Sequence, residues 1–231
     1  MKPYVVCLME TSLDGRLHPS RFTTSPQGGR ADWGRLYEHV HATLKADAWL
    51  VGRVTMAEMV KGVPHPPANV GAVERPVHVA ARAGSYAVAL DPSGRVHFKG
   101  STVGGDPAIA LLGRDVPDSH LAELATDGVS YIVAAGDEID LAAALEVLAR
   151  DFGIERLAVE GGARANGAFF AAGLVDEFSV LIAPALDGRP GSEAIVDAGP
   201  EGLAGKVTLS LLSAETLDHG VVHLRYAVKP A

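Results

Sequence analysis

The chain has 231 residues, of which 48% are hydrophobic and 21% charged, and its formal net charge is −8. This composition excludes disordered and collagen-like proteins, and the acidic balance is unfavourable for binding a phosphate backbone, so we expect no nucleic-acid partner. The single cysteine, Cys7, excludes an internal disulfide and a cysteine-rich zinc site, and it fits a reducing cytoplasm.

The first apolar run, at residues 4–9, ends at Glu10 and is too short for a signal-peptide core or a membrane span. No fixed-period repeat and no linker-like segment divides the chain. We therefore expect a cytoplasmic protein with no membrane contact and one domain over residues 1–231.

The apolar periodicity predicts strands that alternate with helices. In the first part we expect a strand at 4–9, a helix at 32–46, a strand at 48–51 and a short helix at 54–60. The segment 61–75, rich in Pro, Gly and Val, is predicted to be an irregular insertion, and loops of this length are often functional. A strand at 76–81 and a hairpin across 91–94 are expected to follow.

The alternation then continues towards the C-terminus. Strands are expected at 108–112, 131–135 and 156–159, and helices at 118–125, 141–152 and 165–172. Three more strands, at 177–182, 207–212 and 221–228, follow without intervening helices. The pattern predicts a three-layer α/β fold with a mostly parallel central sheet, helices on both faces and an antiparallel C-terminal edge.

A diglycine turn joins the predicted strand at 156–159 to the next helix. Gly161 and Gly162 allow close approach of a ligand to the backbone, and the helix start at Ala163 and Arg164 presents free N–H groups that attract a phosphate. The alternative is a tight turn with no ligand. Glu160 favours a site, because open α/β sheets bind ligands at the carboxyl ends of their strands.

A second turn of the same kind follows the strand at 48–51. Gly52, Arg53 and Thr55 offer N–H groups, a positive charge and a hydroxyl to a phosphate. The alternative is an N-capping threonine beside a solvated arginine. Two such turns could hold a dinucleotide, and Arg82 is a candidate clamp for an adenosine 2′-phosphate, although a solvated loop arginine is the more frequent case.

The first strand ends in a polar turn that contains Ser12 and Asp14, where contacts to a substrate could be presented. An ordinary Asp-Gly turn is the alternative. The nine histidines, His39 and His41 among them, are interpreted as surface or packing residues, and Trp33 and Tyr37 as a packing pair. Motifs of P-loop, standard Rossmann, serine-hydrolase and zinc-deaminase sites are missing, so we expect no metal.

Together these segments resemble the reductase domain of the bacterial riboflavin-biosynthesis deaminase-reductase and its relatives with the dihydrofolate reductase fold. The resemblance covers nearly the whole chain. Its most specific part is Glu160-Gly161-Gly162 together with the Gly-Leu-Val-Asp-Glu at 173–177. The other matching segments are Ser12–Arg16, Thr24–Gln27, Ala46–Thr55 and Pro184–Gly188.

The resemblance implies an NADPH-dependent reductase, usually a homodimer, that passes a hydride to C1′ of the open-chain ribosylamino group of 5-amino-6-(5-phosphoribosylamino)uracil or a similar pyrimidine. On this interpretation Asp14 and Glu160 are catalytic, and Ser12, Thr24 and Glu160 contact the substrate. The cofactor would be held by the two turns and the arginine clamp, which comprise Gly52, Arg53, Thr55, Arg82, Gly161, Gly162, Ala163 and Arg164.

The chain also departs from this family. The deaminase half is absent, so at most one step is expected. Phe22-Thr23-Thr24 stands where the family commonly has Trp-Ile-Thr, and Glu58-Met59-Val60 replaces a pair of aspartates. The cofactor segments match better than the substrate segments. The alternatives are therefore a pterin or dihydrofolate-type reductase, a nucleotide-binding protein without catalysis, and a flavin-dependent oxidoreductase.

Overall fold

The computed structural model describes all 231 residues and contains two compact units. The first unit comprises residues 1–3 and 47–157, and the second comprises residues 4–46 and 158–231. The chain passes from one unit to the other within strand β8 (Arg156–Val159). The expectation of a single domain over the whole chain stays a prediction.

The first unit is built on a parallel ladder of strands in the order β2-β4-β6-β7. Two short strands, β3 and β5, pair antiparallel with β7 and β6. Aliphatic residues fill these strands, as expected where helices cover a parallel sheet. The elements are β2 (Ala48–Gly52), α2 (Arg53–Val60), β3 (Val77–His78), β4 (Tyr86–Asp91), β5 (Thr102–Val103), β6 (Asp106–Leu112), α3 (Asp118–Thr126), β7 (Ser130–Val133) and α4 (Leu141–Phe152).

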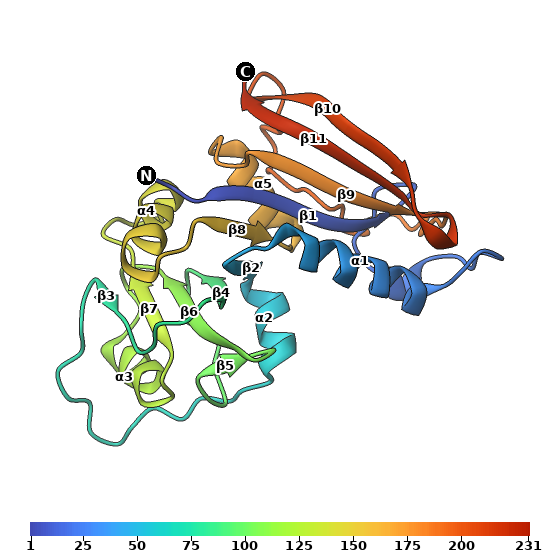
Figure 1. Cartoon of the computed structure of the whole chain (residues 1–231). Coiled ribbons are helices and arrows are strands. Elements are labelled where there is room, and N and C mark those ends of the chain that lie inside the picture. The colour runs from blue at the N-terminus through green and yellow to red at the C-terminus, as the bar shows by residue number, and fades with distance from the viewer. The chain divides into compact units, whose positions relative to one another are not determined.

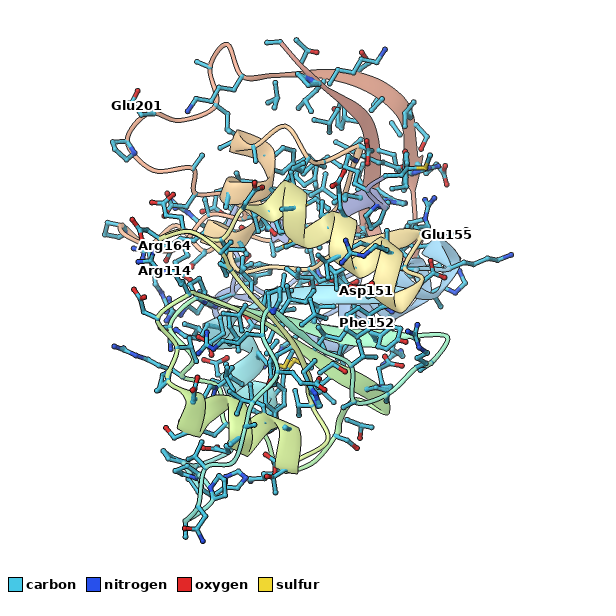
Figure 2. The ribbon with its side chains drawn as sticks, turned by 90° about the vertical axis from the view of Figure 1, so that its left-hand side faces the viewer. Arg114, Asp151, Phe152, Glu155, Arg164 and Glu201 are labelled. Carbon is cyan, nitrogen blue, oxygen red and sulfur yellow. The ribbon has the colours of Figure 1, made fainter.

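Helix α4 is fixed at both ends by its sequence. Asp140 caps its N-terminus by accepting a hydrogen bond from the Ala143 N–H, and Gly153 ends it in the left-handed conformation. The last helical residue, Phe152, is labelled in Figure 2 and packs edge-on against Tyr86 of β4. The helix therefore has the predicted bounds.

The second unit has a sheet in the order β10-β11-β9-β1, and Figure 1 shows β10 and β11 as a long hairpin. Strand β1 is parallel to β9, whereas β11 is antiparallel to both β9 and β10. This confirms the antiparallel C-terminal edge. The elements are β1 (Tyr4–Ser12), η1 (Pro19–Arg21), α1 (Arg30–Leu44), α5 (Ala163–Ala171), β9 (Glu177–Ala183), β10 (Val207–Thr216), η2 (Asp218–Gly220) and β11 (Val222–Pro230).

Helices cover both faces of the sheet in this second unit. On one face Leu8 of β1 packs with Trp33 and Val40 of α1. On the other face Phe178 of β9 meets Phe170 of α5 edge-on, with ring centroids 5.3 Å apart. Because side chains alternate along a strand, the pairing of Leu8 with Ser179 places Phe178 on the opposite face. The predicted α/β fold with helices on both faces is confirmed here.

The predicted hairpin across residues 91–94 is wrong. A turn is present, with the Gly94 N–H donating to the Asp91 carbonyl over 3.1 Å, but strand β4 before it pairs in parallel with β2 and β6. The Asp91 carboxylate accepts hydrogen bonds from the N–H groups of Arg95 and Val96. These bonds hold an irregular segment after the turn, where a hairpin would have a second strand. The turn residues therefore predicted the turn correctly but not the structure that follows it.

Candidate functional site

A buried carboxylate and a histidine form the centre of the candidate site in the second unit. Glu160 follows β8 directly, and its Oε1 lies 2.5 Å from Nδ1 of His41 on α1. The Glu160 side chain is only 11% exposed. A buried carboxylate needs such a partner, because burial without one disfavours its charged form. His41 and Glu160 are therefore joined by a hydrogen bond inside the protein.

The electrostatics of the site favour protonated acids. Burial raises the pKa of Glu160, and the hydrogen bonds from His41 and Tyr37 act in the opposite direction. Burial also raises the pKa of Glu10, to about 7, with the charge of Arg30 opposing it. Glu10 lies on β1, and its Oε1 is buried without a hydrogen-bond partner. Acids with raised pKa values are typical of catalytic sites.

Sequence reasoning missed the helix side of this site. Tyr37 and His41 stand four residues apart on α1, which puts them on one helix face. The interpretation of His41 as a surface or packing residue is wrong, because it binds Glu160; His39 is exposed. The packing of Trp33 and Tyr37 in one cluster is confirmed. Nothing in the sequence indicated the contact between His41 and Glu160, because the two residues are far apart along the chain.

The Ser12–Asp14 turn is a closed set of hydrogen bonds. The hydroxyl of buried Ser12 donates to the Asp14 carboxylate over 2.6 Å and accepts from the Arg16 N–H. The Asp14 oxygens also accept from the N–H groups of Asp187 and Gly188 at 3.0 and 2.9 Å. These bonds, led by that from Ser12, hold the pKa of Asp14 well below its usual range. Asp14 is thus ionised, and its oxygens are already hydrogen-bonded. This arrangement suits a residue that holds two turns together.

Thr24, predicted to contact the substrate, is exposed on the segment between η1 and α1. The neighbouring Thr23 makes two hydrogen bonds to Leu186. Its hydroxyl accepts from the Leu186 N–H, and its own N–H donates to the Leu186 carbonyl. Thr24 is therefore held at the surface by its neighbour.

The diglycine turn has the geometry of a phosphate-binding helix start. Gly162 is the N-cap of α5, no side chain caps it, and a Cβ at this position would meet nothing within 4 Å. Ala163 is buried behind the turn, whereas Arg164, labelled in Figure 2, is 91% exposed. Uncapped N–H groups and open space are what an anionic group needs at a helix start.

The two glycines of this turn differ in their backbone angles. Gly162 has a φ of −54°, which any residue can adopt. Gly161 has a φ of +114°, a conformation that essentially only glycine tolerates. The side chain that a residue at 161 would carry would also lie 3.6 Å from Met9 of β1.

The remaining predicted cofactor residues lie in the first unit. Gly52 is the N-cap of α2, again without a side-chain cap, and Arg53 and Thr55 lie in the first helical turn. Thr55 is thus not the N-cap, which removes that alternative. Arg82 donates from Nη1 to the Asp151 carbonyl over 2.7 Å at the end of α4. Its backbone partner fixes its position and leaves its charge uncompensated by that bond.

The sequence matches a known protein family. A family model described as the RibD C-terminal domain matches residues 3–223. The chain belongs to this family. It is 30% identical over 235 residues to the 2,5-diamino-6-ribosylamino-4(3H)-pyrimidinone 5′-phosphate reductase of Methanothermobacter thermautotrophicus, an alignment that covers 99% of this chain and 100% of that protein.

Solved structures share the fold over the whole chain. A pyrimidine reductase-like protein of Corynebacterium diphtheriae has a TM-score of 0.72 and 19% identity, covering 99% of this chain and 93% of its own. The riboflavin biosynthesis reductase Rib7 of Saccharomyces cerevisiae has a TM-score of 0.59 and 18% identity, covering 98% and 90%. These neighbours confirm the predicted α/β fold.

Membership of this reductase family indicates a nicotinamide cofactor in general. Taken separately, each uncapped helix start offers N–H groups that suit a phosphate, and the space in front of Gly162 is open. No helix is long and apolar enough to cross a bilayer.

Proposed function

We propose that this chain is a pyrimidine reductase of riboflavin biosynthesis that uses NADPH to reduce the ribosylamino group of 2,5-diamino-6-ribosylamino-4(3H)-pyrimidinone 5′-phosphate. The full-length match to the archaeal reductase named for this substrate carries the proposal. The second candidate substrate is 5-amino-6-(5-phosphoribosylamino)uracil, which has an oxygen in place of the 2-amino group. The 5-amino-6-(5-phosphoribosylamino)uracil reductase of Thermotoga maritima, which also carries a deaminase, shares the fold over 57% of its length.

The reaction consists of a ring opening and a reduction. The C1′–O4′ bond breaks, O4′ takes a proton, and the exocyclic nitrogen loses one to give an open-chain imine. A hydride then adds to C1′ and a proton to the nitrogen, which gives the ribitylamino product. The bound nicotinamide would supply the hydride, and the protein must orient the substrate and handle the protons.

The His41–Glu160 pair is the proposed proton-handling group. Its hydrogen bond holds one proton between Nδ1 and Oε1, and burial raises the pKa of the carboxyl towards the working range of a general acid. Glu10, with a pKa of about 7, is a second acid on the same face of β1 as Leu8. Burial raises the pKa of both acids, whereas the hydrogen bonds of Asp14 lower its pKa.

Asp14 and Ser12 are therefore assigned a positioning role. Their bonds join the end of β1 to the turn at Asp187 and Gly188. This fixes the end of the strand that would face the substrate, and the exposed Thr24 remains a candidate for direct substrate contact.

The preference for NADPH over NADH rests on positive charge. Arg53 begins α2, and the guanidinium of Arg82 is held in place by the Asp151 carbonyl. Either could pair with an adenosine 2′-phosphate. The dissociation constants of both cofactors, measured for wild type and for an Arg53→Ala, Arg82→Ala double variant, test this. Equal affinity of wild type for NADPH and NADH would overturn it.

The proposed activity is tested by following NADPH oxidation with each of the two phosphorylated pyrimidines and identifying the product by its gain of two hydrogen atoms in mass spectrometry. We expect turnover with the 2,5-diamino compound. Dihydrofolate or a pterin serves as the contrasting substrate. Turnover with the pterin alone, or NADPH binding without any turnover, would contradict the proposal and favour a diverged reductase or a nucleotide-binding protein.

A further inference from the structure

Three histidines and two carboxylates, none of which is assigned a role above, gather in the first unit. His120 and Glu123 stand three residues apart on α3 and so share one helix face. His97 comes from the segment after the Asp91 turn. The irregular segment 61–75 supplies His65, and Asp127 follows the end of α3. Three separate stretches of chain thus meet at Glu123.

The inner group of this cluster has the spacing of metal ligands. One ligand atom from each of His97, His120 and Glu123 lies within 4.8 Å of the other two. Nδ1 of His97 is 2.6 Å from Oε1 of Glu123, and Nδ1 of His120 is 4.0 Å from Oε2. The two imidazole rings are nearly perpendicular, with centroids 5.2 Å apart. Glu123 therefore presents one oxygen to each histidine.

The most informative residue is His120, because it is buried and neither of its ring nitrogens has a hydrogen bond. It is only 5% exposed, and neither Nδ1 nor Nε2 has a hydrogen bond. An imidazole with two unsatisfied nitrogens in the interior is costly, and a native structure needs a reason for it. Packing alone would be served better by an apolar residue. A lone pair of His120 directed at an ion beside the Glu123 carboxylate supplies that reason.

We propose that His97, His120 and Glu123 bind a divalent transition-metal ion of the Zn²⁺ type. Two imidazole nitrogens and one carboxylate oxygen are a donor set suited to zinc and other late first-row metals, whereas Mg²⁺ and Ca²⁺ prefer oxygen alone. The ion would take the place of the proton between His97 and Glu123. The buried carboxylate, 1% exposed, would then be balanced by a metal charge.

The remaining two residues form an outer pair that orients Glu123. His65 donates from Nδ1 to the Val63 carbonyl over 2.7 Å, and its Nε2 lies 3.0 Å from both Asp127 oxygens. The same Nδ1 is 3.3 Å from Glu123 Oε1. Such second contacts fix the orientation of a ligating carboxylate.

The site would tie the insertion at 61–75 to the body of the first unit. Gly62 lies so close to the backbone of His97 that a Cβ there would sit 1.6 Å from the His97 carbonyl oxygen. The insertion is thus packed against the backbone of His97, and it provides His65, which contacts Glu123. Residues 61–75 contain no helix or strand and lead to the short strand β3. A bound ion would therefore help to order this segment.

The test uses the full-length chain without a histidine tag, stripped with a chelator and titrated with Zn²⁺ against a chromophoric chelator. We expect one tight equivalent, and Co²⁺ in its place should give the visible absorption of a low-coordinate nitrogen and oxygen site. His97→Ala and Glu123→Gln should each weaken Zn²⁺ binding by about 100-fold or more. His39→Ala, which removes an exposed histidine on α1, is the matched control and should bind as wild type does.

Proteolysis of His97→Ala provides a second test of the metal site if Glu123→Gln fails to fold. His97 is partly accessible, so His97→Ala should remain folded by circular dichroism, and Zn²⁺ should protect the 61–75 segment from proteolysis in wild type but not in this variant. Wild-type binding no tighter than that of His97→Ala, or equal loss in His39→Ala, would overturn the proposal. The cluster would then be a hydrogen-bonded group only.

Discussion

At the scale of single residues, Glu160 shows how two opposing effects set the state of a buried acid. Burial raises its pKa, and the hydrogen bonds from His41 and Tyr37 lower it, with burial the larger effect. The net effect is a pKa above the ordinary value of a glutamate, which is the direction that favours a general acid. Asp14 has the reverse balance, because its bonds outweigh its desolvation. Two carboxylates in the same unit are thus suited to different tasks.

The first prediction concerns the proton-handling pair. Glu160→Gln should lower pyrimidine-dependent turnover by about 10²–10⁴ while leaving the NADPH dissociation constant near that of wild type. His41→Gln removes a contact that lowers the Glu160 pKa, so the inflection of turnover against pH should move upwards. Steady-state rates across pH measure both effects. His39→Gln is the control, and unchanged turnover in Glu160→Gln would show that this carboxyl is structural.

The second prediction concerns Glu10 and stability. Its folded-state pKa of about 7 exceeds the ordinary value of 4.5, so between these values the folded state holds more protons than the unfolded state. The contribution of Glu10 to the free energy of unfolding must then fall as pH rises through this window. Glu10→Gln removes the cost of ionising a buried group with an unpartnered oxygen. We expect the variant to gain roughly 1–2 kcal/mol over wild type at pH 8 but little at pH 4.5.

Urea unfolding of wild type and Glu10→Gln at several pH values measures this gain. An exposed glutamate, Glu201→Gln, is the control for a simple change in net charge. A difference between wild type and Glu10→Gln that does not depend on pH would show that the carboxyl at position 10 is not shifted by burial.

At the scale of elements, the start of α5 separates two functions of neighbouring glycines. Gly161 allows the chain to turn at a φ of +114°, whereas Gly162 leaves the space in front of the helix open. A side chain at the first position strains the backbone, and one at the second occupies the proposed phosphate site. We therefore expect a folding requirement at Gly161 and a binding requirement at Gly162.

The third prediction separates these requirements. Gly161→Ala should lower the free energy of unfolding by about 1–3 kcal/mol because of its backbone angle. Gly162→Ala should unfold close to wild type, and Gly162→Val should abolish NADPH binding by filling the open space. Denaturant unfolding and NADPH fluorescence titration provide the two readouts. Normal NADPH binding by Gly162→Val would mean that the turn is structural.

Elements were predictable from the sequence where local signals were complete. Helix α4 has a capping Asp140 and a terminal Gly153, and its bounds were predicted correctly. The turn after β4 was predicted as part of a hairpin, because its residues do not reveal that β4 pairs in parallel with β2 and β6. The Glu160 position followed from the strand and turn pattern. His41 was not found, because its contact depends on how α1 packs across the sheet, and no spacing in the sequence encodes that.

At the scale of the whole molecule, strand β10 is unusually exposed for an apolar strand. Leu209, Leu211 and Leu212 are 50%, 59% and 52% exposed, and only one of the two edges of β10 is paired, with β11. An edge strand with exposed leucines favours association, and soluble proteins normally cover or interrupt such edges. A second copy of this chain is the partner that the expected homodimer would supply.

The last prediction is that the chain is a dimer in solution and that β10 lies in the interface. Light scattering coupled to size exclusion should give twice the chain mass of 24.0 kDa. Leu211→Lys places a charge in the middle of the exposed leucines and should shift the population towards monomer, since burying an unpaired charge opposes association. Leu13→Lys, which changes an exposed leucine on the turn after β1, is the matched control and should leave the dimer intact. If wild type is monomeric, or if both variants dissociate equally, then β10 is not the interface and its exposed leucines need another explanation.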